Sequence, residues 1–245
     1  MTDLRGLRAL VTGGATGIGA ASATLLASRG AEVVVADVNT SAGEALAAQI
    51  GARFAPVDVT SPHGWPALPP FDLAHLNAGT MTKLEPCLME DLTPQNWRRV
   101  HDVNVEGVMN GLFAILPGMQ ERGSGSIVVM GSLAAFVGFG DDPYYGCTKA
   151  LLVNLARALA GPLRSAGIRI NAVCPGEVET RMLPPGRAEL LRSRGYRPLT
   201  PGEVADVVVE TLLGTETGEV FTLVTGAGRE PYGFPGVPKP RRTVT

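Results

Sequence analysis

The feature that most constrains the fold of this chain is a repeated alternation of short apolar, β-branched runs with longer segments of helical periodicity. The strand candidates, apolar on both faces, lie at residues 7–12, 32–36, 53–57, 72–76, 126–130, 168–173 and 219–224. The helical candidates lie at residues 18–28, 42–49, 95–120, 145–163 and 203–213. Strands of this kind separated by helices predict a parallel sheet covered on both faces. Right-handed crossovers then produce a Rossmann-like, doubly wound α/β sandwich.

Composition and patterning exclude several other classes of protein. The 245 residues carry 21 basic and 23 acidic side chains, without the basic surplus that a nucleic-acid-binding protein needs. No apolar run approaches the roughly 18 residues of a membrane span, and residues 1–5 lack the pattern of a signal peptide. Three cysteines without a CxxC pair argue against a disulfide framework. We therefore expect a cytoplasmic protein with no nucleic-acid or membrane partner.

Two proline-rich stretches interrupt the alternation. Residues 58–72 hold four prolines, and we expect a loop there because proline clashes inside a helix. The tail, residues 229–245, holds four more and ends in basic residues. We expect the tail to be disordered; the alternative is that it lies over a neighbouring subunit, with Tyr232 and Phe234 as anchors. Residues 1–228 are expected to form one domain.

A glycine-rich segment follows the first strand and precedes the first helix. Residues 12–19 read Thr-Gly-Gly-Ala-Thr-Gly-Ile-Gly. Glycines allow the backbone to turn sharply and to approach a pyrophosphate without a Cβ clash. The helix start then presents free N–H groups and a positive dipole end to the phosphates. This context predicts dinucleotide binding, and the alternative is a structural turn.

Asp37 ends the second strand, 18 positions after Gly19. A carboxylate at this place can accept both hydroxyls of an adenosine ribose and would repel a 2′-phosphate. A compatible second role is a helix cap, a role that the following residues, 39–41, can also fill. No basic residue stands at Thr16 or Val38, where it could hold a 2′-phosphate. We therefore expect NAD as the cofactor rather than NADP.

Tyr145 and Lys149 are four residues apart on a predicted helix, so that their side chains share a face. A free phenol has a pKa near 10 and is a poor base at neutral pH, but a nearby ammonium favours the phenolate. Ser132 follows the strand at 126–130, at the edge where open α/β sheets hold their ligands. Asn104 interrupts a long helical stretch, either as a satisfied polar side chain or as a kink that holds a water.

Taken together, these residues resemble the short-chain dehydrogenase/reductase family, and the match covers nearly the whole chain in order. By this resemblance, the catalytic set comprises Asn104, Ser132, Tyr145 and Lys149. The cofactor contacts that it implies are Gly13, Thr16, Gly17, Ile18 and Gly19 of the loop, Asp37, Asp58 and Val59 near the adenosine, Asn77, Ala78 and Gly79 after the fourth strand, Tyr145 and Lys149, and Pro175, Gly176, Val178 and Thr180 at the nicotinamide.

The resemblance implies an NAD-dependent oxidoreductase that interconverts a secondary alcohol and its ketone by hydride transfer. Tyr145 would be the general acid or base, Lys149 would lower its pKa and hold the nicotinamide ribose, and Ser132 would polarise the substrate oxygen. Asn104 would anchor a water that links Lys149 to solvent. The alternatives are an enoyl reductase of the same family and a catalytically silent nucleotide-binding relative, which would be expected to lack Tyr145 or Lys149.

The resemblance further implies a substrate lid over residues 177–200 and a homotetramer or homodimer formed through the helices at 95–120 and 145–163. The lid holds five arginines, which we interpret as solvated, with a substrate carboxylate or phosphate as the alternative partner of one of them. An apolar substrate wall is expected from Leu133, Phe136, Phe139, Tyr144, Val178, Met182 and Leu183. Three scattered histidines predict no metal site.

Three departures from the family pattern carry local expectations. The crossover 58–72 is too short for the usual helix, so that one sheet face would be either thinner or covered by Trp65. Cys147, between Tyr145 and Lys149, is expected to be a small buried residue. Glu177 stands where an apolar residue is frequent, and it would either bind a polar substrate group or face solvent.

Overall fold

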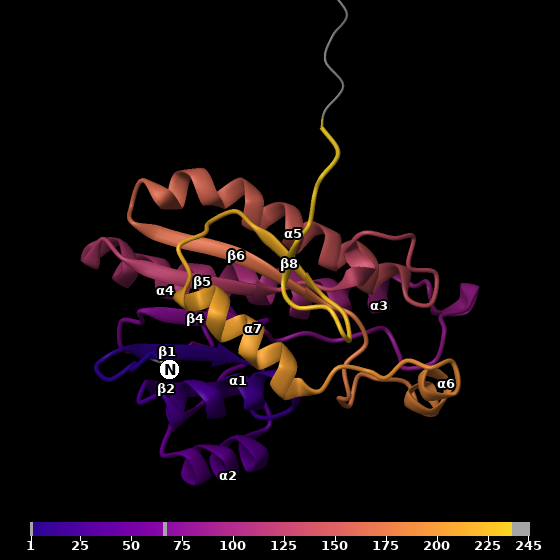
Figure 1. Cartoon of the computed structure of the whole chain (residues 1–245), viewed down its shortest axis with the longest axis horizontal. Coiled ribbons are helices and arrows are strands. Elements are labelled where there is room, and N and C mark those ends of the chain that lie inside the picture. The colour runs from indigo at the N-terminus through magenta and orange to yellow at the C-terminus, as the bar shows by residue number, and fades with distance from the viewer. Residues whose placement is uncertain (1, 66–67, 237–245) are drawn as a thin grey trace, which may run out of the picture.

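The computed structural model describes residues 2–65 and 68–236, and within them one mixed sheet organises the chain (Figure 1). The strand order is β3-β2-β1-β4-β5-β6-β7-β8, parallel except for the last pair. The bounds are β1 Arg8–Thr12, β2 Glu32–Asp37, β3 Arg53–Pro56, β4 Leu73–Leu76, β5 Gly125–Met130, β6 Ile168–Pro175, β7 Val220–Leu223 and β8 Glu230–Pro231. The predicted doubly wound α/β fold is confirmed, with seven strands at the predicted places.

Helices cover both faces of this sheet, and Figure 1 shows α4 and α5 on one side and α1, α2 and α7 on the other. Their bounds are α1 Gly17–Ser28, α2 Thr40–Ile50, α3 Pro94–His101, α4 Gly107–Arg122, α5 Pro143–Arg164, α6 Arg187–Ser193 and α7 Pro201–Leu213. The short helix α6 projects from one end of the sheet, on the side where the strands end.

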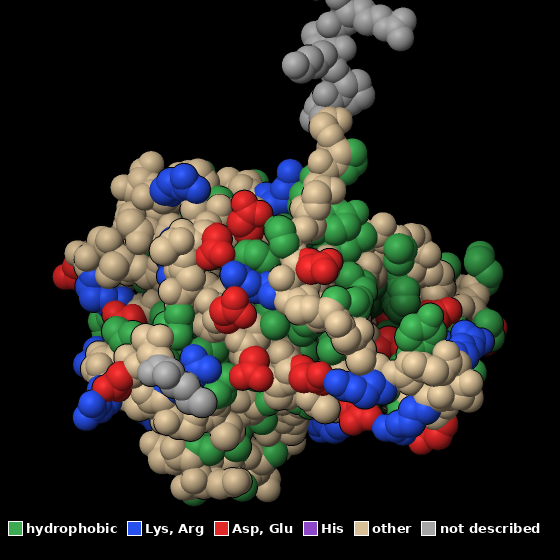
Figure 2. Space-filling model, viewed as in Figure 1, with side chains coloured by type: hydrophobic (Ala, Val, Ile, Leu, Met, Phe, Trp, Pro, Cys, Tyr) green, Lys and Arg blue, Asp and Glu red, His purple; other side chains and the backbone are tan. Residues whose placement is uncertain are grey.

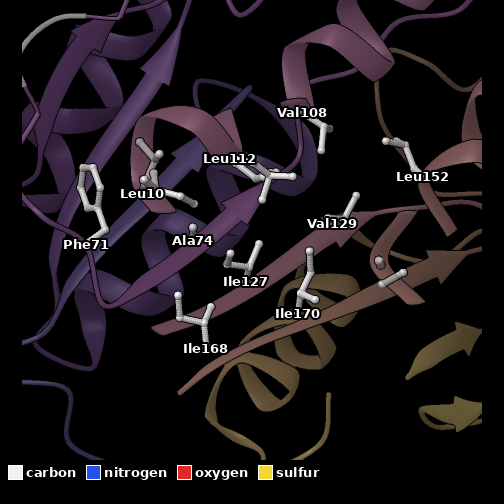
Figure 3. Close-up of a cluster of buried hydrophobic side chains, with 14 of the residues drawn as sticks. Leu10, Phe71, Ala74, Val108, Leu112, Ile127, Val129, Leu152, Ile168 and Ile170 are labelled. Carbon is white, nitrogen blue, oxygen red and sulfur yellow. The ribbon is translucent and has the colours of Figure 1, made fainter. Parts of the chain in front are cut away.

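Two apolar layers result, because each buried strand turns alternate side chains to opposite faces. One layer joins Leu10, Ile127 and Ile170 of the strands to Leu112 of α4 and Leu152 of α5, all fully buried (Figure 3). The other layer packs the opposite strand faces against α1 and α7. Burial on both faces explains why the strands are apolar throughout rather than alternating with polar residues.

The predicted helix at 95–120 is not continuous. It divides into α3, a π-helical segment η2 (Asp102–Glu106) and α4. Asn104 lies in the middle of this π-helical segment, so that the regular α-helix is interrupted at this residue. Such π-bulges insert an extra residue and are frequent at functional sites.

The crossover between β3 and β4 contains no helix in its described parts, residues 57–65 and 68–72, in agreement with the loop expected there. Trp65 is half-buried and packs against the apolar layer beneath α4, close to Gly111. The indole ring thus covers part of the sheet face that a helix would otherwise cover.

The expectation of a disordered tail is wrong for its described part, residues 229–236. Strand β8 pairs antiparallel with β7, and the backbone N–H of Tyr232 donates to the carbonyl of Val220 at 2.7 Å. The Tyr232 ring stacks on Phe136 with centroids 3.9 Å apart, and the Arg157 guanidinium lies 3.7 Å from the centroid of Phe234. Both predicted anchors therefore hold the tail to its own chain. The basic end of the tail lies outside the described residues.

Among the described helices, none combines the length and apolar character that crossing a bilayer requires.

Candidate active site

A cleft of about 1360 Å³ opens where the central strands end. Most of the predicted site residues line this single cavity, although they come from segments that span residues 13–180. They are Gly13, Thr16, Gly17, Ile18, Asp37, Asp58, Val59, Asn77, Ala78, Gly79, Ser132, Tyr145, Lys149, Pro175, Gly176, Val178 and Thr180. Gly19 and Asn104 are buried directly behind its wall. The structure thus brings the predicted nucleotide and catalytic ends together.

The glycine loop is packed too tightly for side chains. A Cβ at Gly19 would lie 2.1 Å from the carbonyl oxygen of Gly13, and one at Gly13 would lie 2.8 Å from the Ala78 Cα. The Asn77 side-chain amide donates to the carbonyls of Thr12 and Gly13, each at 3.1 Å. The Asn-Ala-Gly segment therefore braces the loop from the neighbouring strand β4.

The loop leads into the N-terminus of α1 with its first donors uncapped. Thr16 is the N-cap residue, but its hydroxyl makes no capping bond, and the first turn holds no acidic residue. Free N–H groups, the positive helix end and a backbone without Cβ atoms together suit a pyrophosphate. The residues present therefore fit the phosphates of a dinucleotide cofactor.

Asp37 lies at the end of β2, half-buried and facing the cleft. Its two carboxylate oxygens accept bonds from the backbone N–H groups of Ala15 (3.0 Å) and Asn39 (2.9 Å). The cap of α2 is Asn39, whose side chain accepts from Ala42. A carboxylate has about four acceptor sites, so that Asp37 keeps capacity for ribose hydroxyls. Asp58 and Val59 line the cleft beside it.

Tyr145 and Lys149 project from the first two turns of α5; Lys149 is buried, and Tyr145 is partly buried at the wall of the cleft. The Lys149 Nζ donates to the carbonyl of Met130 at 2.8 Å and lies 5.5 Å from the Tyr145 ring centroid. Burial lowers the pKa of Lys149 to about 8. Ser132 begins the short turn η3 (Leu133–Ala135) on the opposite wall, and its Oγ accepts from the Ala134 N–H at 3.2 Å.

The pKa of Tyr145 differs from the expectation. Burial raises it to about 12, and the neighbouring Ser132 hydroxyl opposes this rise only in part. The Lys149 charge is directed at the Met130 carbonyl and is not among the causes of the Tyr145 shift. The expected lowering of the Tyr145 pKa by Lys149 is therefore not found in this arrangement of side chains.

Asn104 is fully buried and satisfied by protein groups. Its side-chain oxygen accepts from the Thr80 N–H (2.7 Å), while its amide nitrogen donates to the Thr80 carbonyl (2.9 Å) and the Thr148 hydroxyl (3.0 Å). Thr148 donates in turn to the Tyr145 carbonyl at 2.8 Å. Asn104 is therefore a satisfied polar side chain, the first of the two interpretations, and it lies in the π-helical segment. The water relay stays a prediction.

Sequence reasoning missed Asp142, a buried carboxylate that sets the start of α5. Its Oδ1 accepts from the Tyr145 N–H (3.1 Å) and the Thr82 hydroxyl (2.9 Å), and its Oδ2 accepts from the Thr82 N–H (2.6 Å). Asp142 thereby ties the helix that carries Tyr145 to the loop after β4. The dipeptide Asp142-Pro143 was the available signal, because Asp is favoured at the N-cap and Pro at the first helical position.

Residues 177–200, the segment expected to form the substrate lid and called the lid below, begin and end in a short backbone pairing. The Leu199 N–H donates to the Glu177 carbonyl and the Glu179 N–H to the Leu199 carbonyl, each at 2.8 Å. Val178 faces the cleft from this pairing. Thr180 follows, with its methyl group beside Gly17 of the cofactor loop. The segment from Pro175 to Thr180 is therefore held in place at both the sheet and the loop.

Most lid arginines form ion pairs within the protein. Arg187 pairs with Glu177 (2.5 Å), Arg192 with Glu179 (2.5 Å) and Arg197 with Glu203 (2.7 Å). Figure 2 shows basic and acidic side chains interspersed over this end of the molecule, around α6. Glu177 lines the cleft and pairs with Arg187, the first residue of α6, and its role toward a substrate stays a prediction.

The apolar wall of the cleft is confirmed for five of the seven expected residues, namely Leu133, Phe139, Val178, Met182 and Leu183. Phe136 instead stacks on Tyr232, and Tyr144 packs edge-on against Trp97 with centroids 5.5 Å apart. Met81, Leu84, Val137, Leu190 and Leu191 complete the lining. The expectation that Cys147 is buried is wrong, because it lies on the exposed face of α5.

Comparison with known proteins places the chain in a family. Residues 8–190 match the model of the short chain dehydrogenases. This chain is a member of that family. Members of the family bind nicotinamide cofactors, and the glycine loop and α1 N-terminus described above fit such a group. Within the described residues, no cluster of three or more His, Cys, Asp or Glu side chains could hold a metal.

Relatives in the family share about a third of the residues. A 3-alpha-(or 20-beta)-hydroxysteroid dehydrogenase of Mycobacterium bovis is 33% identical over 84% of this chain and 82% of its own length. A cyclohexanol dehydrogenase of Acinetobacter sp. is 33% identical over 82% and 85%. The solved structure of a 3-oxoacyl-[acyl-carrier protein] reductase with bound NAD from Brucella melitensis has a TM-score of 0.83 at 28% identity and covers 91% of both chains.

Proposed function

We propose that this protein is an NAD-dependent oxidoreductase that interconverts a secondary alcohol and its ketone, with Tyr145 as the general acid or base. The observation that carries the proposal is the shared cleft, in which Tyr145, Lys149 and Ser132 face the same cavity as the glycine loop. A nicotinamide cofactor supplies the hydride acceptor or donor when it is bound. The protein supplies position and electrostatics.

The side chains of Tyr145, Ser132, Lys149 and Asn104 divide the acid–base work in this proposal. In oxidation Tyr145 Oη takes the hydroxyl proton of the substrate, and in reduction it returns this proton to the carbonyl oxygen. The Ser132 hydroxyl donates a hydrogen bond to the same substrate oxygen. Because burial, with the charges of Cys174 and Asp142 adding to it, raises the Tyr145 pKa to about 12, the phenolate needs the ammonium of Lys149 turned toward it. Lys149 would also hold the nicotinamide ribose, and Asn104 the proton relay.

NAD is preferred over NADP because Asp37 puts a negative charge where a 2′-phosphate would lie. The relatives support the choice, since two Brucella melitensis reductases of the same fold have solved structures with NAD or NADH bound. We expect Asp37→Ala to weaken NADH binding and to narrow the preference over NADPH, measured as the ratio of the two dissociation constants. An unchanged ratio would place the discrimination elsewhere.

The substrate is proposed to be an uncharged, hydrophobic secondary alcohol or ketone. The substrate end of the cleft is lined by leucine, methionine, valine and phenylalanine, and the lid arginines Arg187 and Arg197 are paired with carboxylates. The names of the hydroxysteroid and cyclohexanol dehydrogenases agree with alicyclic alcohols. An enoyl reductase is the weaker alternative, because Ser132 beside Tyr145 suits carbonyl chemistry.

The direct test is a panel of alicyclic alcohols and ketones, with NADH absorbance as the readout and both NAD and NADP supplied. We expect turnover of at least one neutral member with NAD, and Tyr145→Phe should reduce kcat about a thousandfold or more while NADH still binds. The matched control is Tyr144→Phe, on the same helix but packed against Trp97. Normal turnover by Tyr145→Phe would refute the assigned role.

The proposed assembly is a homotetramer or homodimer, with residues 1–228 as one catalytic domain. The outer faces of α4 and α5 expose Phe113, Leu151 and Cys147, which is apolar surface suited to a second copy. Sedimentation at micromolar concentration tests this assembly, and a monomer there would contradict it.

A further inference from the structure

Arg181, a lid residue that directly follows Thr180, contacts the cofactor loop. Its Nη2 donates to the Thr16 Oγ1 at 3.0 Å, across 165 positions of sequence, and both residues line the cleft. The preference for NAD rests on the Asp37 carboxylate and on the absence of a basic residue at positions 16 and 38. The structure supplies a guanidinium to that position from a distant segment.

The other cations that line the cleft in the described part of the chain are already engaged. Lys83 pairs with Asp91, Arg187 with Glu177 and Arg197 with Glu203, while Lys149 donates to the Met130 carbonyl. Arg181 has no carboxylate within ion-pairing distance among the described residues and contacts a neutral hydroxyl. Lys149 also contacts only a neutral group, but it lies beside Tyr145 at the catalytic end. At the nucleotide end, Arg181 is the lining cation without a carboxylate partner among the described residues.

The position of Arg181 follows from anchored neighbours. The backbone pairing of Glu177 and Glu179 with Leu199 holds the base of the lid, and Thr180 lies against Gly17 at the start of α1. Arg181 follows directly, so that its guanidinium lies beside the uncapped N–H groups of α1. A guanidinium beside free backbone donors suits an anionic oxygen better than a neutral group.

We propose that Arg181 binds the pyrophosphate of the dinucleotide and thereby ties the lid to the bound cofactor. The inference rests on the proposed function insofar as a dinucleotide occupies the cleft. The pyrophosphate is favoured over a 2′-phosphate because Thr16 immediately precedes the first turn of α1. Asp37, which accepts from the N–H of Ala15, places a repelling carboxylate on the adenosine side of the same loop.

The test compares Arg181→Gln with Arg194→Gln by calorimetric binding of NADH, NADPH, ADP-ribose and adenosine. Arg194 lies on the same lid but does not line the cleft, so it controls for loss of one lid charge. Arg181→Gln should weaken NADH and ADP-ribose by roughly tenfold, leave adenosine unchanged, and reduce the salt dependence of NADH binding. NADPH should be weakened by a similar factor.

A loss confined to NADPH would overturn the inference, because it would make Arg181 a ligand of the 2′-phosphate. Equal binding of NADH to both variants and the unmodified protein would also overturn it, with the proposed function intact. Failure of the unmodified protein to bind either NADH or ADP-ribose would instead remove the proposed function and the inference together.

A second readout tests the tie between the lid and the cofactor. Hydrogen exchange of residues 181–196 should slow when ADP-ribose binds to the unmodified protein and to Arg194→Gln, and should change much less in Arg181→Gln at saturating ligand. Equal protection in all three proteins would show that the lid responds to the ligand without Arg181 and would contradict the proposed tie.

Discussion

The two ends of the cleft are held by different kinds of contact. At the nucleotide end, glycine backbone packs within van der Waals distance of backbone, braced by the side chain of Asn77. At the substrate end, α6 buries none of its residues, and exposed ion pairs such as Arg192–Glu179 hold the lid. Close packing has little tolerance for added atoms, whereas an exposed ion pair contributes less than about 1 kcal/mol. We expect substitutions at the nucleotide end to destabilise the protein strongly and substitutions in the lid to have little effect on stability.

The largest effect is expected at the glycine loop. Gly19→Ala places a Cβ against the Gly13 carbonyl, which should cost about 2–3 kcal/mol of unfolding free energy and weaken NADH binding more than tenfold. Thermal unfolding and calorimetry measure the two quantities. Gly161→Ala is the matched control, because its Cβ would meet no atom within 4 Å and alanine favours the helix α5. If Gly19→Ala behaved like this control, the contrast between the two ends would be lost.

A smaller loss of unfolding free energy is expected when the pH is lowered, because a buried histidine in β4 must then take up a proton. His75 is fully buried in β4, and neither ring nitrogen has a hydrogen-bond partner among the described residues. Burial, aided by the charge of Lys149, lowers its pKa to about 3. Its folded pKa lies below the unfolded value near 6.5, so stability is full above pH 6.5 and falls as pH drops toward 3.

At pH 5 the predicted loss is about 2 kcal/mol, from 1.36 kcal/mol for each pKa unit. His75→Leu should remove this loss, as followed by chemical denaturation between pH 8 and pH 5. His63→Gln, at an exposed position in the crossover, should keep it. An identical pH slope in His75→Leu would show that other groups govern the acid sensitivity.

The smallest effect on stability is expected at the lid. Glu177→Gln breaks the pair with Arg187 and should change the unfolding free energy by less than about 1 kcal/mol. It should nevertheless free a guanidinium in the cleft and lower KM for an alicyclic ketone that carries a carboxylate, relative to the neutral parent. Glu189→Gln, on the outer face of α6, should alter neither. If Glu177→Gln left the ratio of the two KM values unchanged, the ion pair between Glu177 and Arg187 would no longer support the proposal of a neutral substrate.

Local sequence patterns were sufficient to predict the features whose geometry is determined within a single segment of the chain. Apolar runs predicted seven strands and their parallel pairing, and the glycine loop, Ser132, Tyr145 and Lys149 were found at the cleft as expected. These features depend on neighbours close in sequence or on the common rule that ligands bind where parallel strands end.

Other features depend on which side chains meet after folding, and the sequence alone did not reveal them. Phe136 turned from the cleft to Tyr232, Cys147 proved exposed, and Asp142 joined two loops that are 60 positions apart. The charge of Arg181 reached Thr16 only because the lid folds back over α1.

The chain therefore encodes its architecture and chemical groups in short-range patterns of polarity and glycine. The packing of distant segments settles which charges are neutralised, which aromatic rings line the cleft and how strongly burial shifts each pKa. These properties depend on distances through space and on exclusion of water, and neither quantity is written in the spacing of residues along one strand or helix.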